Sequence, residues 1–231
     1  GIPVLTVHHN CVSCLNKRYR EIILGNKQNN KLWRILDRPV VWKFLRYRNR
    51  KKYKKLFEQS IKYSDKLVLL SEKFIPELDH YNVKYDRKEV VGIPNPAPFG
   101  IVPEALNVKE NRLVFVGRLS ITQKRVDRLV KIWHQVHDEF KNWHFDIVGD
   151  GDALNYLNSY IKKHNLKRIH LHGFQNPKPY LNKAKIFTLT SDFEGYGMVL
   201  VEAQAYGVVP VSFNCFSAIG DIIKKNIRYK K

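Results

Sequence analysis

Short apolar runs alternate with segments of helical periodicity after Asn111, and this alternation restricts the possible folds more than any other feature of the sequence. The apolar runs are RLVFVG (112–117), HFDIVG (144–149), IHLH (169–172), KIFTLT (185–190) and VVPVSF (208–213). Helical segments are predicted between them, the clearest of them over 126–140. Strands that alternate with helices form a parallel sheet with helices on both faces. This part of the chain is therefore predicted to be a doubly wound α/β domain.

The first hundred residues carry a weaker signal of the same kind. Apolar runs at 2–7, 66–70 and 90–93 predict three buried strands. Pro94, Pro96 and Pro98 follow the third run, and prolines this close together continue neither a central strand nor a helix. We therefore predict a partial N-terminal domain over 1–97, a linker over 98–110 and a C-terminal domain over 111–231. The chain begins inside the first run, so we expect an upstream portion to be missing.

Positive charge dominates the chain, with 41 Lys and Arg against 21 Asp and Glu and a net charge of +20. Such an excess attracts an anionic partner, namely nucleic acid, an acidic membrane surface or a phosphorylated ligand. Residues 17–55 hold 15 of the Lys and Arg but only Glu21 and Asp37 among the acids. Aromatic side chains, including Trp42 and Tyr47, lie between these cations, a pattern typical of interfacial helices.

Three interpretations of residues 17–55 stay open: a solvated helical face, docking on an anionic membrane, and nucleic-acid binding. Pro39 can open a helix in this segment. Apolar and basic side chains would then lie on one side of this helix, namely Val41, Phe44, Leu45 and Arg48. With Trp42 and Tyr47 at headgroup level, this helix would bind the membrane peripherally. The sequence contains no run of 18 apolar residues, so no spanning helix is predicted.

The three cysteines are too few for a disulfide framework, and they predict a reducing compartment. Cys11 and Cys14 form a single C-x-x-C directly after His8 and His9. A structural zinc site usually takes its ligands from two separated pairs, so we predict no metal site here.

The residues that follow the first strand of the C-terminal domain suit a diphosphate. Gly117 and Arg118 end this strand, and Lys124 precedes the next helix. Ligands of parallel sheets bind outside the carboxyl ends of the strands. Arginine can donate two parallel hydrogen bonds to phosphate oxygens, whereas lysine acts as a point charge. The alternative is a pair of surface cations in a basic protein.

The next two strand ends give weaker signals. Gly149-Asp150-Gly151 allows a close backbone approach to a ligand, but a plain tight turn explains it equally well. Phe174 follows the third strand and can meet a nucleotide base, with a core aromatic as the alternative.

The fourth strand end, SDFEGYGMVLVEA (191–203), is the most specific. Glu194 lies in the predicted loop and Glu202 in the predicted helix, with seven residues between them. Gly195 and Gly197 remove side chains, which leaves helix N-terminal amides to meet anionic or hydroxyl oxygens. Carboxylates accept hydrogen bonds from sugar and ribose hydroxyls. The alternatives are a helix-dipole interaction for Glu194 and a solvent-facing position for Glu202.

The stretch EGYGMVLVEAQAYGVVPV (194–211) resembles the E-x7-E motif of family 4 glycosyltransferases, which are retaining enzymes of the GT-B architecture. The segments LSEKF, IPNP, FVGRL, DIVGDGD and HGFQNP occur in the order and spacing of that family. The resemblance covers most of residues 64–223. It implies a GT-B type α/β fold of two Rossmann-like domains, the N-terminal one incomplete.

The resemblance also implies roles for individual residues. Glu194 would contact the donor sugar, Glu202 the ribose, and Arg118 and Lys124 the diphosphate beside Gly117. Sugar and phosphate oxygens would be capped by the amides of Gly197, Met198, Val199 and Leu200, with Gly195 keeping the loop open. His8 or His9 would face the reacting centre beside Glu194. One departure concerns Arg125, where family members often have glycine, and it could crowd the turn or add a phosphate contact.

We therefore predict a hexosyltransferase that moves a hexose or N-acetylhexosamine from a UDP-sugar, with retention, to a glycan or lipid-linked acceptor in cell-surface polysaccharide synthesis. It would act in the cytoplasm, peripherally on the inner face of the membrane, with no nucleic-acid partner. Fixed cations would replace a metal, and a metal requirement would reopen Asp150 and Asp192 as ligands. The alternatives are a non-catalytic relative that binds the nucleotide sugar and a basic nucleic-acid-binding protein.

Overall fold

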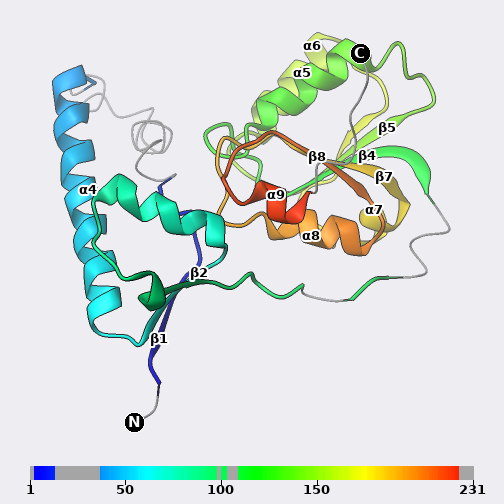
Figure 1. The fold of residues 1–231 in the computed structure, drawn as a ribbon. Coiled ribbons are helices and arrows are strands. Elements are labelled where there is room, and N and C mark those ends of the chain that lie inside the picture. The colour runs from blue at the N-terminus through cyan, green and yellow to red at the C-terminus, as the bar shows by residue number, and fades with distance from the viewer. Residues whose placement is uncertain (1–2, 14–36, 98–99, 103–108, 224–231) are drawn as a thin grey trace. The chain divides into compact units, whose positions relative to one another are not determined.

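A computed structural model describes residues 3–13, 37–97, 100–102 and 109–223. The chain divides into two compact units (Figure 1). The first unit comprises Gly1–Asn95, Glu194–Tyr196 and Phe216–Lys231, and the second comprises Pro96–Phe193 and Gly197–Cys215.

The first unit is built on a parallel sheet of three strands in the order β1-β2-β3. Its strands are β1 (Leu5–His8), β2 (Lys66–Leu69) and β3 (Val90–Gly92). Its helices are α4 (Pro39–Lys62) and the 3-10 helices η1 (Glu72–Tyr81) and η2 (Arg87–Glu89). A strand forms at each of the three apolar runs, as predicted, but the first strand is not buried, because Leu5 and Val7 are 58% and 45% exposed. The helix that Pro39 opens is confirmed, because this proline stands at its first turn.

The second unit is a parallel sheet of five strands with helices between them. The strands are β4 (Glu110–Val116), β5 (His144–Val148), β6 (Ile169–Leu171), β7 (Ala184–Leu189) and β8 (Val209–Ser212). The helices are α5 (Val126–Val136), α6 (Leu154–Lys163), α7 (Lys178–Lys183), α8 (Met198–Ala205) and α9 (Ile219–Ile222), of which α9 is grouped with the first unit. The predicted α/β fold class, with parallel sheets, is confirmed.

Apolar side chains on the strands and on one side of α5 form the core of the second unit. Val114 and Phe115 on the central strand are fully buried. Helix α5 buries Leu129, Val130 and Trp133, which recur at helical spacing. The Trp133 indole N–H donates to the carbonyl oxygen of Lys167 at 2.9 Å, so the polar end of this buried ring is satisfied.

The strand order of the second unit fixes where a ligand is expected. The order is β6-β5-β4-β7-β8, so the chain moves outward from β4 on one side and then crosses to the other side of β4. The direction reverses between β4 and β7, which pair directly. Ligands of open parallel sheets bind at such a reversal, outside the carboxyl ends of the strands. The loops after β4 and β7 are therefore the place to look for a site.

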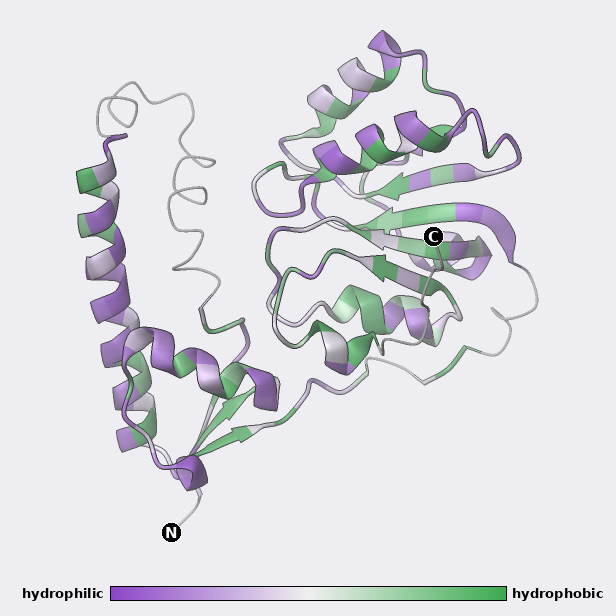
Figure 2. Ribbon diagram, turned by 45° about the horizontal axis from the view of Figure 1, so that its top comes forward, coloured by the Kyte–Doolittle hydropathy of each residue, from purple (hydrophilic) through white to green (hydrophobic). Residues whose placement is uncertain are grey.

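Helix α4 is the longest helix that the structure describes, and Figure 2 colours it largely hydrophilic. Within the described parts of the chain, no helix is both long and apolar enough to cross a bilayer. Residues 17–36 of the basic segment lie outside the described residues.

Candidate functional site

The loops after β4 and β7 are joined by hydrogen bonds. The hydroxyl of Thr190, just after β7, lies 3.1 Å from the carbonyl oxygens of both Lys124 and Arg125. The amide of Asp192 donates to the carbonyl oxygen of Gln123 at 2.9 Å. These bonds fix the end of the β4 loop against the start of the β7 loop.

Two arginines and two carboxylates strengthen this connection, and we call Arg125, Asp127, Arg128 and Asp192 the arginine junction. Arg125 Nη1 lies 3.0 Å from Asp192 Oδ2, and Arg128 Nη2 lies 2.8 Å from Asp192 Oδ1. Arg125 Nε also donates to Asp127 Oδ1 at 3.0 Å. The hydrogen bonds that Arg125 donates to Asp127 raise the pKa of Arg125, so this side chain stays charged. Burial pushes the pKa of Asp127 upward, but hydrogen bonds from Arg125 outweigh it and hold that pKa low.

The junction explains the departure at Arg125. This residue has φ 49°, in the left-handed region that glycine adopts most readily. Its guanidinium binds the carboxylates of Asp127 and Asp192. Arg125 therefore stabilises the loop that carries the predicted diphosphate residues.

The predicted diphosphate residues lie in one short loop. Arg118 is exposed, and its Nη2 donates to Oε1 of Gln123 at 2.9 Å. The half-buried Lys124 side chain passes Gly117, because a Cβ built on this glycine would lie 3.8 Å from Lys124 Cε. Between them, Leu119 is buried and its amide donates to the carbonyl oxygen of Asp150 at 2.8 Å. The structure thus brings Gly117, Arg118 and Lys124 together on a fixed loop.

The glycines after β5 serve the packing of neighbouring loops. A Cβ at Gly149 would lie 1.9 Å from the carbonyl oxygen of Gly117, a distance that no side chain tolerates. The amide of Gly117 donates to the carbonyl oxygen of Val148 at 3.0 Å. Gly149 thus lets the loop after β5 lie directly against the loop after β4.

Phe174, after β6, is 89% exposed, so the alternative of a core aromatic is wrong. The residue before its loop is held firmly, since His172 Nε2 lies 2.7 Å from Oδ1 of the buried Asp146. The Phe174 ring therefore projects from an anchored segment and is accessible to a planar ligand.

The start of α8 presents backbone amides and carries no acidic side chain in its first turn. Gly197 precedes it with φ 74°, a conformation that a side chain would strain. The amide of Leu200 donates to the carbonyl oxygen of Gly197 at 2.8 Å, so it is already engaged. First-turn amides such as those of Met198 and Val199 have no intrahelical acceptor. Further along, Glu202 is half-buried, and burial raises its pKa.

The remaining site candidates belong to the first unit. The His8 ring packs edge-on against Phe57, with 5.0 Å between the ring centroids. Burial, with a smaller effect of His9, lowers the pKa of His8, whereas the His9 side chain is exposed. Glu194 is buried at 6% exposure. Its neighbour Gly195 is close to β1, since a Cβ there would lie 3.0 Å from the carbonyl oxygen of His9.

Sequence reasoning missed the roles of Arg128, Thr190 and Asp192 in joining the two loops. The available signal was a polar triplet, Thr190-Ser191-Asp192, directly after a buried strand. It was visible in the sequence, but its arginine partners lie about 65 residues earlier and no local pattern links them.

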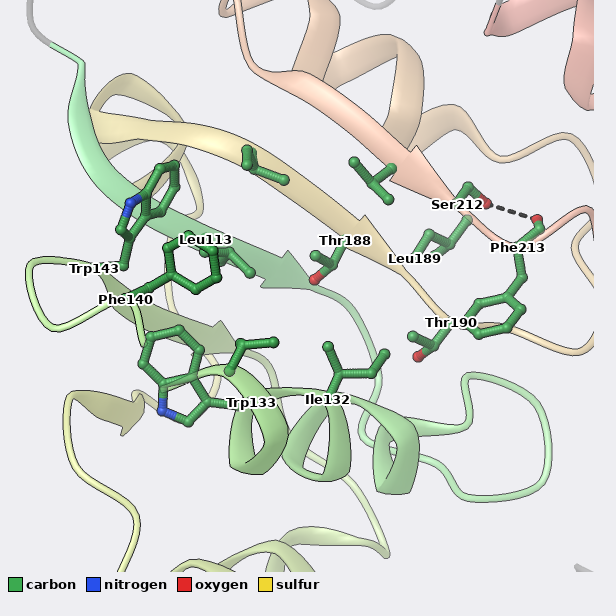
Figure 3. Close-up of a pocket in the computed structure, with 13 residues that line it drawn as sticks. Leu113, Ile132, Trp133, Phe140, Trp143, Thr188, Leu189, Thr190, Ser212 and Phe213 are labelled. Carbon is green, nitrogen blue, oxygen red and sulfur yellow. Dashed lines mark hydrogen bonds between the residues drawn. The ribbon is translucent and has the colours of Figure 1, made fainter. Parts of the chain in front are cut away.

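A cavity of about 500 Å³ lies on the face of the second sheet between α5 and strands β4, β7 and β8, and it shares Thr190 with the loop after β7 (Figure 3). It is lined by Leu113, Ile132, Trp133, Val136, Phe140, Trp143, Ile186, Thr188, Leu189, Thr190, Val211, Ser212 and Phe213. None of these residues is charged, and most are apolar. A wall of this kind suits neither a diphosphate nor a sugar, so we place the candidate site at the strand ends.

No metal centre emerges from the part of the chain that the structure describes, where no three His, Cys, Asp or Glu side chains are placed to share an ion. Cys11 is disulfide-bonded, and Cys14 lies outside the described residues.

Several known proteins are similar to this chain in sequence or in fold. A family model described as "Glycosyl transferases group 1" matches residues 100–229. The amylovoran biosynthesis glycosyltransferase AmsD of Erwinia amylovora is 30% identical over 169 residues, which cover 70% of this chain and 46% of the relative. In Campylobacter jejuni, the GalNAc-alpha-(1->4)-GalNAc-alpha-(1->3)-diNAcBac-PP-undecaprenol alpha-1,4-N-acetyl-D-galactosaminyltransferase is 30% identical over 193 residues, 82% of this chain and 49% of that protein. The chain thus spans about half the length of the curated relatives it matches.

Among solved structures, the pneumococcal O-GlcNAc transferase GtfA in complex with UDP and GlcNAc matches with a TM-score of 0.65 and 21% identity. The match covers 75% of this chain and 35% of GtfA. At this identity the likeness concerns the fold, and it agrees with the predicted GT-B type.

Proposed function

The chain belongs to the glycosyl transferases group 1 family, and on that premise we propose that it transfers a hexose or N-acetylhexosamine from a UDP-sugar, with retention at the anomeric carbon. One observation carries the proposal. Arg118, Lys124 and the start of α8 flank the β4 and β7 strand ends, where the strand order reverses. Two cations and helix amides at such a position form a site for a diphosphate.

The diphosphate is the leaving group of the proposed reaction. Its negative charge grows as the bond to the sugar breaks, and Arg118 and Lys124 stabilise that charge. Preorganised donors of this kind contribute roughly 3 kcal/mol each to the transition state. Fixed cations thereby take the place of a metal, and we propose that donor binding persists in EDTA.

Glu202 accepts hydrogen bonds from the ribose hydroxyls in this proposal, and Glu194 contacts the donor sugar. A half-buried carboxylate is costly to the folded protein unless a partner satisfies it, and ribose hydroxyls would do so. Phe174 stacks on the base with its exposed ring.

His9 is our candidate for the histidine that faces the reacting centre. Successive side chains of an extended strand point to opposite sides, so we expect His8 and His9 to face different ways. His8 is used in packing on Phe57, which leaves the exposed His9 to meet a substrate.

The acceptor is proposed to be a glycan or lipid-linked sugar used in cell-surface polysaccharide synthesis. The names of the relatives support this class: one is named for amylovoran biosynthesis, and another is named as an N-acetylgalactosaminyltransferase of an undecaprenol-linked glycan. An acceptor with a polyprenyl anchor stays in the bilayer, so we place the protein peripherally on the inner face of the membrane.

A thermal-shift comparison of UDP, GDP, ADP and a DNA duplex at two salt concentrations tests the proposal. Stabilisation by UDP that survives moderate salt and EDTA is expected, since a ligand that binds only the folded state raises its stability. Stabilisation by DNA alone, lost steeply with salt, would reject the donor site in favour of nucleic-acid binding. Transfer assays on anomerically defined UDP-sugars then separate an enzyme from a relative that only binds the donor.

A further inference from the structure

Helix α4 presents two unlike sides. Trp42 and Phe57 are buried, at 2% and 1% exposure, and the Trp42 indole N–H donates to Asp37 Oδ1 at 2.6 Å. On the opposite side, Val40, Phe44 and Tyr47 are 78%, 57% and 54% exposed. Large apolar side chains with this exposure need an explanation when they lie together.

The exposed residues form one continuous stripe. Val40, Phe44, Tyr47 and Lys51 stand at i, i+4, i+7 and i+11, which places them on a single side of a helix. The exposed side of the helix therefore differs from the one predicted from the sequence, since Val41 and Leu45 are only partly exposed. The prediction that Trp42 lies at headgroup level is wrong, because its ring packs inside the first unit.

Cations surround the stripe. Helix α4 contains nine Lys and Arg and a single acid, Glu58. Glu58 pairs with Lys54 at 3.5 Å, and the ion pairs of the described residues include no other member of the helix. Arg48 lies over the Phe44 ring at 5.8 Å and Lys51 over the Tyr47 ring at 4.8 Å. The positive charge is thus held beside the exposed rings.

We propose that this face of α4 docks on an anionic lipid surface, with the helix lying in the plane of the membrane. Val40, Phe44 and Tyr47 enter the headgroup layer, and the surrounding Lys and Arg contact lipid phosphates with their long apolar stems along the surface. Nucleic acid would use the cations but not an apolar stripe in their midst. The inference rests on the proposed function, because it gives the protein access to a lipid-linked acceptor.

Vesicle sedimentation tests the proposal with phosphatidylglycerol-containing and pure phosphatidylcholine liposomes. The full chain should bind the anionic vesicles, and salt should weaken that binding. The double variant Phe44→Ser with Tyr47→Ser keeps every charge and should bind at least about tenfold more weakly, since each ring loses apolar burial. Leu56→Ser is the matched control, because Leu56 is exposed on α4 but lies off the stripe, and it should bind as the unaltered chain does.

A charge variant completes the test. Changing Arg48 and Lys51 to Gln keeps the rings and should weaken binding by about fivefold for each cation, equivalent to about 1 kcal/mol near an anionic leaflet. Equal binding of the serine double variant and the unaltered chain would overturn the proposal, as would equal binding to neutral vesicles or preferential capture of a DNA duplex.

The UDP thermal shift of the same variants separates this inference from the proposed function. If the serine double variant no longer binds vesicles but is still stabilised by UDP, the docking face is supported. Vesicle binding that persists in the serine variant refutes it whatever UDP does, whereas a missing UDP shift in the unaltered chain refutes the donor site alone.

Discussion

The outward face of α4 and the arginine junction are both rich in cations, but they differ in where the carboxylates lie. Helix α4 holds nine Lys and Arg and a single acid, the exposed Glu58, which pairs with Lys54. In the junction, Asp127 and Asp192 are 8% and 10% exposed, and they bind Arg125 and Arg128. Cations that bind buried carboxylates hold loops together, whereas cations without them remain available to an anionic partner.

The comparison shows that the net charge of +20 does not describe one property of the chain. Part of the charge is structural and part is available for binding. Arg118 belongs with the second class, because it donates to a neutral amide of Gln123 and is exposed. Neighbouring arginines, seven residues apart, therefore have different roles.

The largest expected loss of stability comes from a variant that breaks the arginine junction. Asp192→Asn keeps the shape of the side chain but removes the charge that Arg125 and Arg128 share. Removal of one partner from a fully buried ion pair costs about 3–5 kcal/mol, and these arginines are partly exposed, so we expect about 2–3 kcal/mol. Urea unfolding measures the loss.

Glu58→Gln on α4 is the matched control, because it also neutralises one acid that pairs with a cation. An exposed i,i+4 pair contributes only about 0.3–0.5 kcal/mol. If both variants lost the same stability, the distinction between the two kinds of cation would fail.

A smaller effect concerns the backbone at Arg125. Arg125→Ala loses the ion pairs and keeps a side chain at φ 49°, whereas Arg125→Gly loses the ion pairs but removes the strain. We therefore expect the glycine variant to be about 1 kcal/mol more stable than the alanine variant, by the cost of a left-handed residue. The same unfolding assay checks this order, and an alanine variant as stable as the glycine variant would contradict it.

The smallest expected effect concerns Glu202, for which the described residues provide no cation to compensate its burial. Burial raises its pKa, so the folded chain holds this proton more tightly than the unfolded chain does. The resulting stability is full below the unfolded pKa of about 4.3 and is lost as the pH rises through the folded pKa. Glu202→Gln should therefore melt slightly above the unaltered chain at pH 7, and the gap should close toward pH 4.

Glu202→Gln should also weaken UDP binding, whereas Glu194→Gln should leave UDP binding nearly unchanged and weaken binding of the intact UDP-sugar. The two carboxylates are assigned to opposite ends of the donor, and calorimetry with both ligands tests the assignment. Equal losses for UDP in the two variants would contradict it.

The strands were predictable because buried parallel strands are continuous apolar runs, and the five runs after Asn111 all form strands. The loop that carries Gly117, Arg118 and Lys124 was predictable from its place after a strand. The arginine junction was not predictable, because Asp192 and Arg125 are 67 residues apart and meet only when β4 and β7 pair. The burial of Trp42 was also missed, because helical spacing alone does not say which side of α4 packs.

The measurement that tests the donor site most directly is calorimetric binding of UDP and uridine to the unaltered chain, Arg118→Ala and Lys124→Ala. Each variant should lose about 1.5–3 kcal/mol of affinity for UDP, the range for hydrogen bonds to charged groups, because both side chains are assigned to the diphosphate. Uridine binding should be the same in all three proteins. If uridine binding fell as far as UDP binding, the two cations would support the fold of the loop, and the diphosphate site proposed at the ends of β4 and β7 would be wrong.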